Sequence, residues 1–209
     1  MVRGVGLGVL GLGLVAVGTF VGCVRHSGGT WAFDSAPLPE GWPELTPVGE
    51  VQVKTYPLAR AAIVRDVDLP KDGSRGGQGA MFGELFGHIK DRGIAMTAPV
   101  EMGYRETEGG ELEMDEMGFY YRTLDMGPAG TDGSVRVVDQ AEQTYATVGT
   151  RGSYSARRYA DGLALIEAFL QSSPEWQAAG EPRFLGYNGP FTLWFWRYGE
   201  VQMPVEPRG

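Results

Sequence analysis

Residues 81–100 read MFGELFGHIKDRGIAMTAPV. Apolar side chains in the first half of this stretch recur at the spacing of one helix face, and they are Met81, Phe82, Leu85, Phe86 and Ile89. Gly93 is typical of a helix end, and Pro99 interrupts the extended chain that follows. The pattern therefore predicts a helix over residues 78–92 and extended chain over residues 94–104.

The segments around this stretch repeat one order of elements. Two strand-like runs lie within residues 50–68, and residues 111–124 read as a further strand. Two strand-like runs, a helix and two extended runs then recur over residues 135–139, 144–150, 154–172, 183–187 and 191–205. Such a duplication predicts an α+β fold, a curved antiparallel sheet with both helices on its outside or across its groove. The expected ligand site is a cleft where the two halves meet.

Three strings occur in register along the chain. They are MFGELFGHI at 81–89, IAMTAPV at 94–100, and GYNGP at 186–190 followed by WFWRYGEV at 194–201. With these strings the chain resembles the SOUL family of haem-binding proteins over residues 47–206. The resemblance implies a distorted antiparallel β-barrel that is flanked by two helices and built from a duplicated half, in agreement with the repeat. It also implies non-covalent binding of haem or a related tetrapyrrole in a hydrophobic cleft.

The resemblance also implies particular site residues. Phe82, Leu85 and Phe86 match helix positions that line the haem cleft in the family, and Tyr187 matches its loop tyrosine. His88 is either an axial iron ligand or a boundary histidine at a place where the family often has an aromatic residue. We expect affinity to come mainly from apolar contact by Phe82, Phe86 and Tyr187 rather than from an iron bond.

Charged partners for the ligand are few. Lys90, Arg92 and Arg105 are the candidates for the haem propionates. Covalent haem attachment is excluded because the chain has no Cys-x-x-Cys-His string.

Two other classes of function stay open. Catalytic patterns are weak, since Ser153 and Ser155 have no positioned histidine, so an enzyme is not expected. Some relatives of this architecture look like hydrolases and others bind bulky apolar cations, so binding or hydrolysis of another bulky apolar molecule is the alternative. A protein-interaction module is the third possibility, because strand alternation over residues 191–205 puts Trp194 and Trp196 on one face.

The N-terminus reads as a targeting segment. Arg3 precedes an uncharged run of apolar residues and glycines that ends at Cys23. Residues 1–23 therefore resemble a signal peptide with a lipobox, which predicts a lipid on Cys23 and an exported protein held on the periplasmic or outer side of a bacterial membrane. An uncleaved membrane anchor is the alternative, because the run is about the ~20 residues that span a bilayer.

The rest of the chain divides into a linker and one domain. Residues 24–47 are rich in Pro and Gly and predict a linker. Trp31, Phe33 and Trp42 interrupt it, which leaves open that part of it packs on the domain. Residues 48–207 predict the haem-binding domain. The net charge of -8 and the lack of a Lys/Arg cluster exclude nucleic acid as a partner. The single cysteine excludes an intrachain disulfide.

Overall fold

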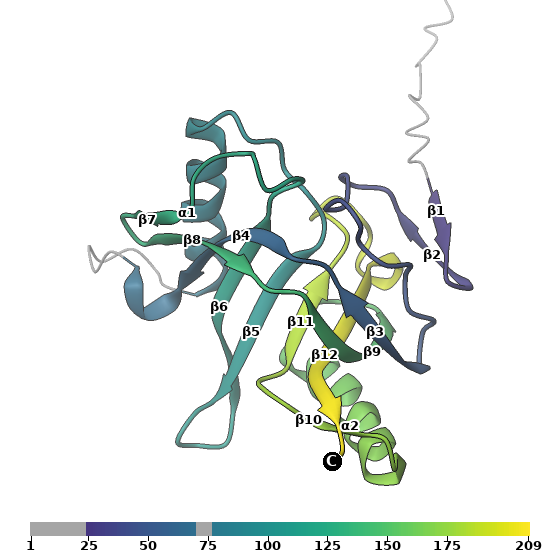
Figure 1. Cartoon of the computed structure of the whole chain (residues 1–209). Coiled ribbons are helices and arrows are strands. Elements are labelled where there is room, and N and C mark those ends of the chain that lie inside the picture. Colours follow the sequence, from purple (N-terminus) through teal and green to yellow (C-terminus); the bar gives the residue numbers. More distant parts are fainter. Residues whose placement is uncertain (1–23, 70–76) are drawn as a thin grey trace, which may run out of the picture.

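The computed structural model describes residues 24–69 and 77–209, and its main feature is a curved antiparallel sheet of ten strands with two flanking helices (Figure 1). The strands of the sheet are β3 Val51–Tyr56, β4 Ala59–Arg65, β5 Val100–Glu106, β6 Leu112–Tyr120, β7 Gly130–Asp132, β8 Val135–Gln140, β9 Gln143–Arg151, β10 Trp176–Ala178, β11 Arg183–Gly186 and β12 Tyr198–Pro207. The predicted α+β class and curved sheet are confirmed. The sheet does not close into a barrel, because its path runs from β3 at one edge to β7 at the other.

The strand order carries the duplication that the sequence predicts. The sheet runs β3-β9-β12-β11-β5-β6-β4-β8-β7, with β10 paired to β12 off this path. In chain order the first half is β3, β4, α1, β5, β6 and the second half is β8, β9, α2, β11, β12. In chain order, β3, β4, β5 and β6 of the first half correspond to β8, β9, β11 and β12 of the second. Corresponding strands lie equally far from the middle of the sheet, on opposite sides of it. The two halves therefore meet where β5 pairs with β11.

Helix α1, Gln78–Asp91, follows the predicted apolar stripe. It buries Met81, Leu85, His88 and Ile89 against the sheet. Gly93 ends it with a φ of 66°, and the Ile94 amide donates to the Ile89 carbonyl at 2.8 Å. This left-handed residue is the usual helix terminator, since glycine adopts it without a steric penalty.

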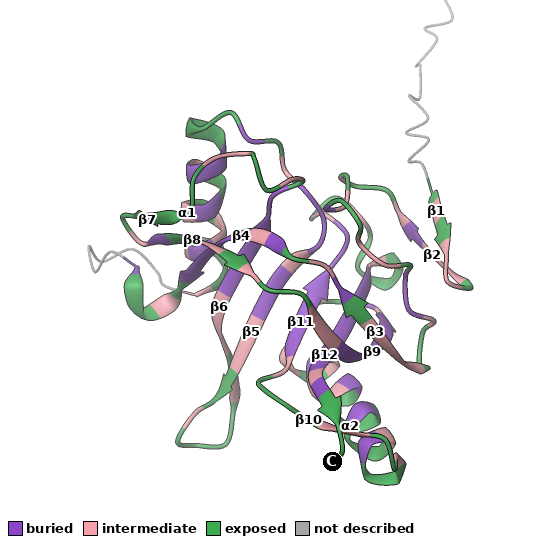
Figure 2. Cartoon of the chain, viewed as in Figure 1, coloured by how far each residue is buried: buried purple, intermediate pink, exposed green. Residues whose placement is uncertain are grey.

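Helix α2, Ala156–Ser172, begins at Ser155, whose hydroxyl accepts a hydrogen bond from the Arg158 amide. It buries Tyr159, Gly162, Ile166 and Leu170. Tyr159, Ile166 and Leu170 share one apolar cluster with the buried apolar side chains of α1, so both helices cover the same face of the sheet. Figure 2 shows the buried residues along β5, β11 and β12 and the exposed ones at the hairpin tips.

Residues 24–47 are packed on the domain instead of forming a free linker. They contain the hairpin of β1, Val24–Ser27, and β2, Thr30–Phe33. Ala32 and Leu45 are buried in an apolar cluster on the sheet face opposite the helices. The indole of Trp42 donates to the Tyr187 hydroxyl at 3.0 Å. Burial of these apolar side chains outweighs the local preference of Pro and Gly for irregular chain.

The chain before β12 differs from the sequence prediction. Residues 191–205 were predicted to be extended throughout, but β12 begins only at Tyr198 and the short 3-10 helix Trp194–Trp196 precedes it. Arg197 bends the chain here, because its guanidinium donates to the carbonyls of Pro190 and Thr192, each at 2.9 Å. Without a strand there is no alternation, and Leu193, Trp194, Phe195 and Trp196 are all exposed.

The predicted targeting segment, including Cys23, lies outside the described residues. Within residues 24–69 and 77–209, no helix has the length and apolar character needed to cross a membrane.

Candidate functional site

An apolar cavity of about 480 Å³ lies at the junction of the two halves. Its walls come from the start of α1, the segment before β5, strands β5 and β6, and the loop after β11. The main lining side chains are Phe82, Met96, Val100, Met102, Met117, Tyr154, Tyr187 and Arg197. The cleft predicted between the repeated halves is therefore present on the helix-covered face of the sheet.

Gly186 and Tyr154 shape one wall of the cavity. A Cβ on Gly186 would lie only 2.8 Å from the Tyr154 ring and 3.0 Å from the Met102 methyl group, so the absence of a side chain lets the ring lie against the strand. The Tyr154 hydroxyl donates to the Tyr198 carbonyl and accepts from the Asn188 amide, both at 2.8 Å. These bonds fix the ring, and the wall is preformed.

Two of the predicted contact residues line the cavity and two others do not. Phe82 and Tyr187 are part of its wall. Leu85 is fully buried in the core under α1. Phe86 is about half exposed and stacks on Phe82 with ring centroids 6.1 Å apart, on the side away from the cavity lining. The structure therefore brings together one helix residue and one loop residue out of the predicted set.

His88 lies in a separate polar cluster outside the cavity. Its side chain is 2% exposed. Nε2 lies 2.9 Å from the Tyr121 hydroxyl and Nδ1 lies 3.2 Å from the Asp132 carboxylate. Burial lowers the pKa of His88, and the neighbouring Arg92 lowers it further. Both ring nitrogens have protein partners, so this histidine ties α1 to Tyr121, directly after β6, and to Asp132 in β7.

The described residues contain no cluster of three or more His, Cys, Asp and Glu side chains that could hold a metal ion. The cavity itself offers the thioethers of Met96, Met102 and Met117, of which Met96 is the most accessible.

Arg197 is the cation of the cavity, and sequence reasoning missed it. It lines the wall, and its guanidinium carbon lies 5.9 Å from the centre of the Tyr154 ring. Two of the cations named from the sequence are engaged elsewhere, since Arg92 pairs with Asp132 at 2.6 Å and Arg105 pairs with Asp115 at 3.5 Å. The sequence did contain a signal for a role of Arg197 at the site, because this residue lies inside the string at 194–201 that carries the family resemblance.

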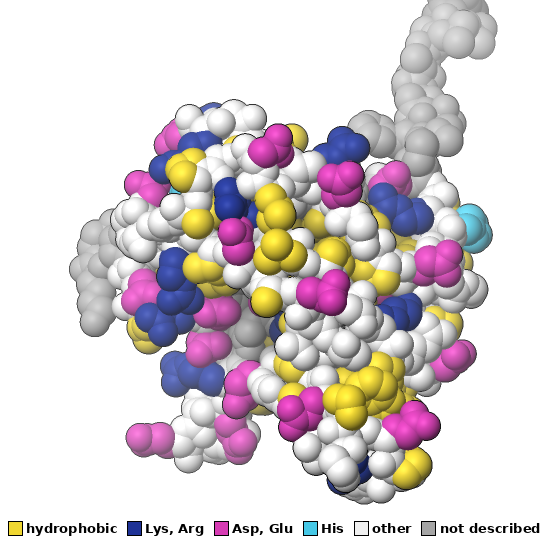
Figure 3. Space-filling view, viewed as in Figure 1, with side chains coloured by type: hydrophobic (Ala, Val, Ile, Leu, Met, Phe, Trp, Pro, Cys, Tyr) yellow, Lys and Arg dark blue, Asp and Glu magenta, His cyan; other side chains and the backbone are white. Residues whose placement is uncertain are grey.

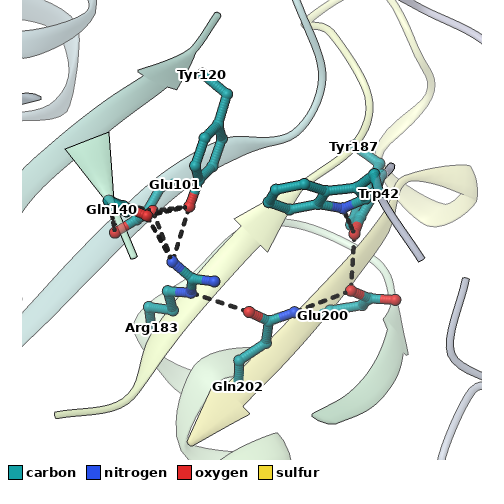
Figure 4. A network of polar contacts seen from close by, with 8 residues as sticks. All are labelled: Trp42, Glu101, Tyr120, Gln140, Arg183, Tyr187, Glu200 and Gln202. Carbon is teal, nitrogen blue, oxygen red and sulfur yellow. Dashed lines mark hydrogen bonds and ion pairs between the residues drawn. The ribbon is translucent and has the colours of Figure 1, made fainter. Parts of the chain in front are cut away.

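The opposite face of the sheet holds a connected polar network (Figure 4). Arg183 forms an ion pair with Glu101 at 3.1 Å and donates to Gln202 at 2.9 Å. Gln202 donates to Glu200 at 3.2 Å, and the Tyr187 hydroxyl donates to Glu200 at 2.7 Å. Tyr187 therefore belongs to the lining of the apolar cavity, while its ring packs on Tyr198 and its hydroxyl is part of this network.

A second cavity of about 800 Å³ lies beside the network, and Tyr159 and Leu163 of α2 also line it. Its lining includes Glu101, Glu116, Tyr104, Tyr145 and Arg183. Burial, and then the neighbouring Glu101, raises the pKa of Glu116. Figure 3 shows a hollow between the β5–β6 hairpin and the lobe that carries α2, with acidic side chains around it. This cavity is acidic where the first is apolar.

Comparisons with known proteins agree with this architecture. The family model described as SOUL heme-binding protein matches residues 45–204. A search of curated proteins finds no significant match.

Among solved structures, the chain is similar to the C-terminal domain of EcmrR, with a TM-score of 0.52, 17% identity, and coverage of 75% of this chain and 97% of that domain. The match to EcmrR in its DNA complex has a TM-score of 0.54 and 17% identity, and it covers 75% of this chain but only 57% of that longer one. A hydrolase from Listeria innocua matches with a TM-score of 0.53 and 13% identity, covering 77% of this chain and 94% of the hydrolase. Likeness at these identities shows the fold alone.

Proposed function

The chain belongs to the SOUL heme-binding protein family, and from this premise we propose that its apolar cavity binds haem or a related tetrapyrrole without a covalent bond. The observation that carries the proposal is the cavity at the junction of the halves, which combines apolar walls with the single cation Arg197 among its described lining residues. A tetrapyrrole with propionates has the matching chemistry, namely a flat apolar ring and carboxylates at one edge.

The residues of the cavity fit such a ligand. Its volume of about 480 Å³ lies within the ~300–1,000 Å³ typical of small-molecule sites. Phe82, Val100 and Tyr154 supply flat or branched apolar contact. Arg197 uses Nε and Nη2 to hold its own loop, so Nη1 can donate to a propionate. Binding in this arrangement depends on apolar contact and one charge, and His88 takes no part in it.

The proposal makes the chain a binding protein and not an enzyme. We also propose, from the N-terminal sequence, that the chain is exported and held at a bacterial membrane by a lipid on Cys23. The experiment on the ligand does not depend on that tether, because the chain can be studied in detergent.

The test is a titration of the full chain in detergent with haemin and with metal-free protoporphyrin, followed by absorbance and by porphyrin fluorescence. Empty micelles are the control. We expect both compounds to saturate one site and to compete, because the proposed contacts do not involve iron. Failure of both compounds to saturate a site contradicts the proposal. Saturation by haemin with no binding of protoporphyrin contradicts the claim that iron is not needed.

The acidic cavity supports a second candidate function, which is binding of a bulky apolar cation. Glu116 and Glu181 supply negative charge, whereas Arg183 offsets the charge of Glu101. The rings of Tyr104 and Tyr145 supply faces that attract cations. Titration with a triarylmethyl cation dye tests it, with Glu116→Gln as the diagnostic variant. Dye binding that is weakened by Glu116→Gln and not displaced by protoporphyrin assigns the dye to this second cavity.

A further inference from the structure

The loop before β12 is a cluster of exposed aromatic and aliphatic side chains. Its members, exposed between 43% and 100%, are Phe191, Leu193, Trp194, Phe195 and Trp196. Other exposed large apolar side chains, such as Val67 and Leu165, stand far apart along the chain. Single exposed apolar residues are normal on a protein surface, whereas a contiguous apolar patch usually marks a binding surface. We call these five residues the aromatic loop.

The aromatic loop is held in one shape although its side chains face outward. Arg197 donates to the carbonyls of Pro190 and Thr192, and Arg151 donates to the carbonyl of Trp196 at 3.0 Å. The Trp196 amide also closes a turn onto the Leu193 carbonyl at 2.9 Å. These backbone carbonyls and this amide already have hydrogen-bond partners, so the loop gains no hydrogen bonds by adopting another conformation. The exposure of its side chains is therefore a property of the fold.

The aromatic loop lies next to the point where the described chain begins. The ring of Phe33 lies 5.5 Å from the ring of Trp196. Phe33 pairs across the β1–β2 hairpin with Val24, which directly follows Cys23 (Figure 1). Only one strand pair and one ring contact thus separate the proposed tether from the aromatic loop. A lipid on Cys23 and an uncleaved apolar span over residues 4–22 both put Val24 at a membrane surface.

We propose that the aromatic loop docks on the lipid bilayer to which the N-terminus is tethered. Tryptophan favours the interface between water and hydrocarbon, and phenylalanine and leucine insert their apolar side chains just below it. A tether that begins one residue before β1 leaves the loop little room to stay away from this interface. The inference rests on the proposed tether and is independent of the proposed ligand.

One consequence concerns access to the apolar cavity. Gly189, Pro190 and Arg197, which flank the aromatic loop, also line that cavity. Docking therefore brings this side of the cavity near the bilayer, where a tetrapyrrole or another apolar molecule dissolves more readily than in water.

The test is tryptophan quenching in vesicles of phosphatidylcholine and phosphatidylglycerol in which part of the phosphatidylcholine carries bromine on its acyl chains. The full chain is inserted through its own N-terminus. We expect the brominated lipid to quench the emission, and we expect most of this quenching to be lost in the Trp194→Phe/Trp196→Phe variant, which removes the reporters but keeps the loop apolar. Trp176→Phe, in β10 beside α2, is the matched control and keeps the quenching.

A second pair of variants tests the docking itself. Phe191→Ser/Trp194→Ser should move Trp196 away from the lipid and reduce its quenching, whereas Val67→Ser/Leu165→Ser should leave the quenching unchanged. All four residues are exposed, so these variants retain the fold, which circular dichroism checks.

Absence of quenching in the parent chain overturns the proposal, as does quenching that persists in Trp194→Phe/Trp196→Phe. A chain that is dimeric in detergent and becomes monomeric in Phe191→Ser/Trp194→Ser also overturns it, because the loop then contacts a second copy. Haemin binding in detergent is measured separately, so failure of the docking proposal and failure of the ligand proposal are distinguishable.

Discussion

His88 illustrates the limit of helix periodicity at the scale of one residue. The spacing places this histidine at the edge of the apolar stripe, and that position is compatible both with a ligand and with a structural role. The structure gives it two partners, Tyr121 and Asp132, that lie 33 and 44 residues away in the chain. No local pattern encodes such partners, so the sequence left both interpretations of His88 open and could not name the residues that hold it.

The first prediction concerns the loss of His88. His88→Ala leaves the buried Tyr121 hydroxyl without its partner at 2.9 Å, and an unsatisfied buried group costs about 1–3 kcal/mol. We expect the free energy of unfolding, measured with urea, to fall by about that amount, and we expect the haemin affinity to stay unchanged. Loss of haemin binding with unchanged stability contradicts this assignment.

The same residue predicts a dependence of stability on pH. Burial lowers the pKa of His88 in the folded chain below its ordinary value of about 6.5. The unfolded chain therefore binds more protons just below that pH, so the contribution of His88 to stability is full above about pH 6.5 and declines as the pH falls. Asp132 and Asp91 oppose the shift, and Arg92 reinforces it. Urea midpoints of the parent chain and of His88→Ala should converge as the pH is lowered, and parallel curves contradict the assignment.

The second prediction concerns Arg197. If its guanidinium meets a propionate, Arg197→Gln removes a charged hydrogen bond worth about 1.5–3 kcal/mol, which weakens haemin binding roughly 10- to 100-fold. Protoporphyrin dimethyl ester has no carboxylates and should bind the variant and the parent chain equally. Equal weakening for the ester shows a disturbed loop instead of a lost charge, and it contradicts the assigned contact.

Helices and paired strands were the elements that the sequence predicted well, and irregular segments were not. Apolar spacing indicated α1 and α2 because each has one face on a sheet, and this packing leaves a clear period in the sequence. The aromatic loop has the composition of a strand, but the hydrogen bonds of Arg197 and Arg151 to its carbonyls determine a different path. The hairpin within residues 24–47 was hidden by Pro and Gly for a similar reason, since its stability comes from contacts with distant parts of the domain.

Two helix glycines provide the third prediction. A Cβ at Gly162 in α2 would lie 2.5 Å from the Cγ2 atom of Val201, whereas a Cβ at Gly87 in α1 meets no atom within 4 Å. Gly162→Ala should lower the free energy of unfolding by about 1–3 kcal/mol through overpacking, despite the better helix propensity of alanine. Gly87→Ala should raise it by up to about 1 kcal/mol. Urea unfolding of both variants is the measurement, and an equal sign of the two changes contradicts the packing described for α2.

At the scale of the whole molecule, the duplicated order of elements predicted both the sheet and the place of the apolar cavity. Repetition fixes which strands occupy equivalent positions, and a junction between repeats follows from that. The composition of the cavity wall was less predictable. Met102 and Met117 read as ordinary strand residues, and only the pairing of β5 with β6 and β11 brings them beside Tyr154 and Gly186.

The fourth prediction concerns the tether. Cys23→Ser removes the residue that accepts a lipid, so a lipoprotein should change in mass and lose its stable attachment to membranes. The measurement is mass spectrometry of the membrane and soluble fractions of bacterial cells expressing each form. Identical mass shifts and identical partition for both forms contradict lipidation and leave the apolar run over residues 4–22 as the anchor.

The central claim is that the apolar cavity, and not the outer face of α1, holds the tetrapyrrole. Phe82 and Phe86 are neighbours that stack on each other, yet only Phe82 lines the cavity. The most direct measurement is therefore the haemin dissociation constant of the parent chain, Phe82→Ala and Phe86→Ala. We expect Phe82→Ala to weaken binding roughly 5- to 30-fold, equivalent to about 1–2 kcal/mol of lost apolar contact, and Phe86→Ala to leave it unchanged. Weakening by Phe86→Ala with no effect of Phe82→Ala would place the tetrapyrrole on the outer face of α1 and contradict binding in the cavity.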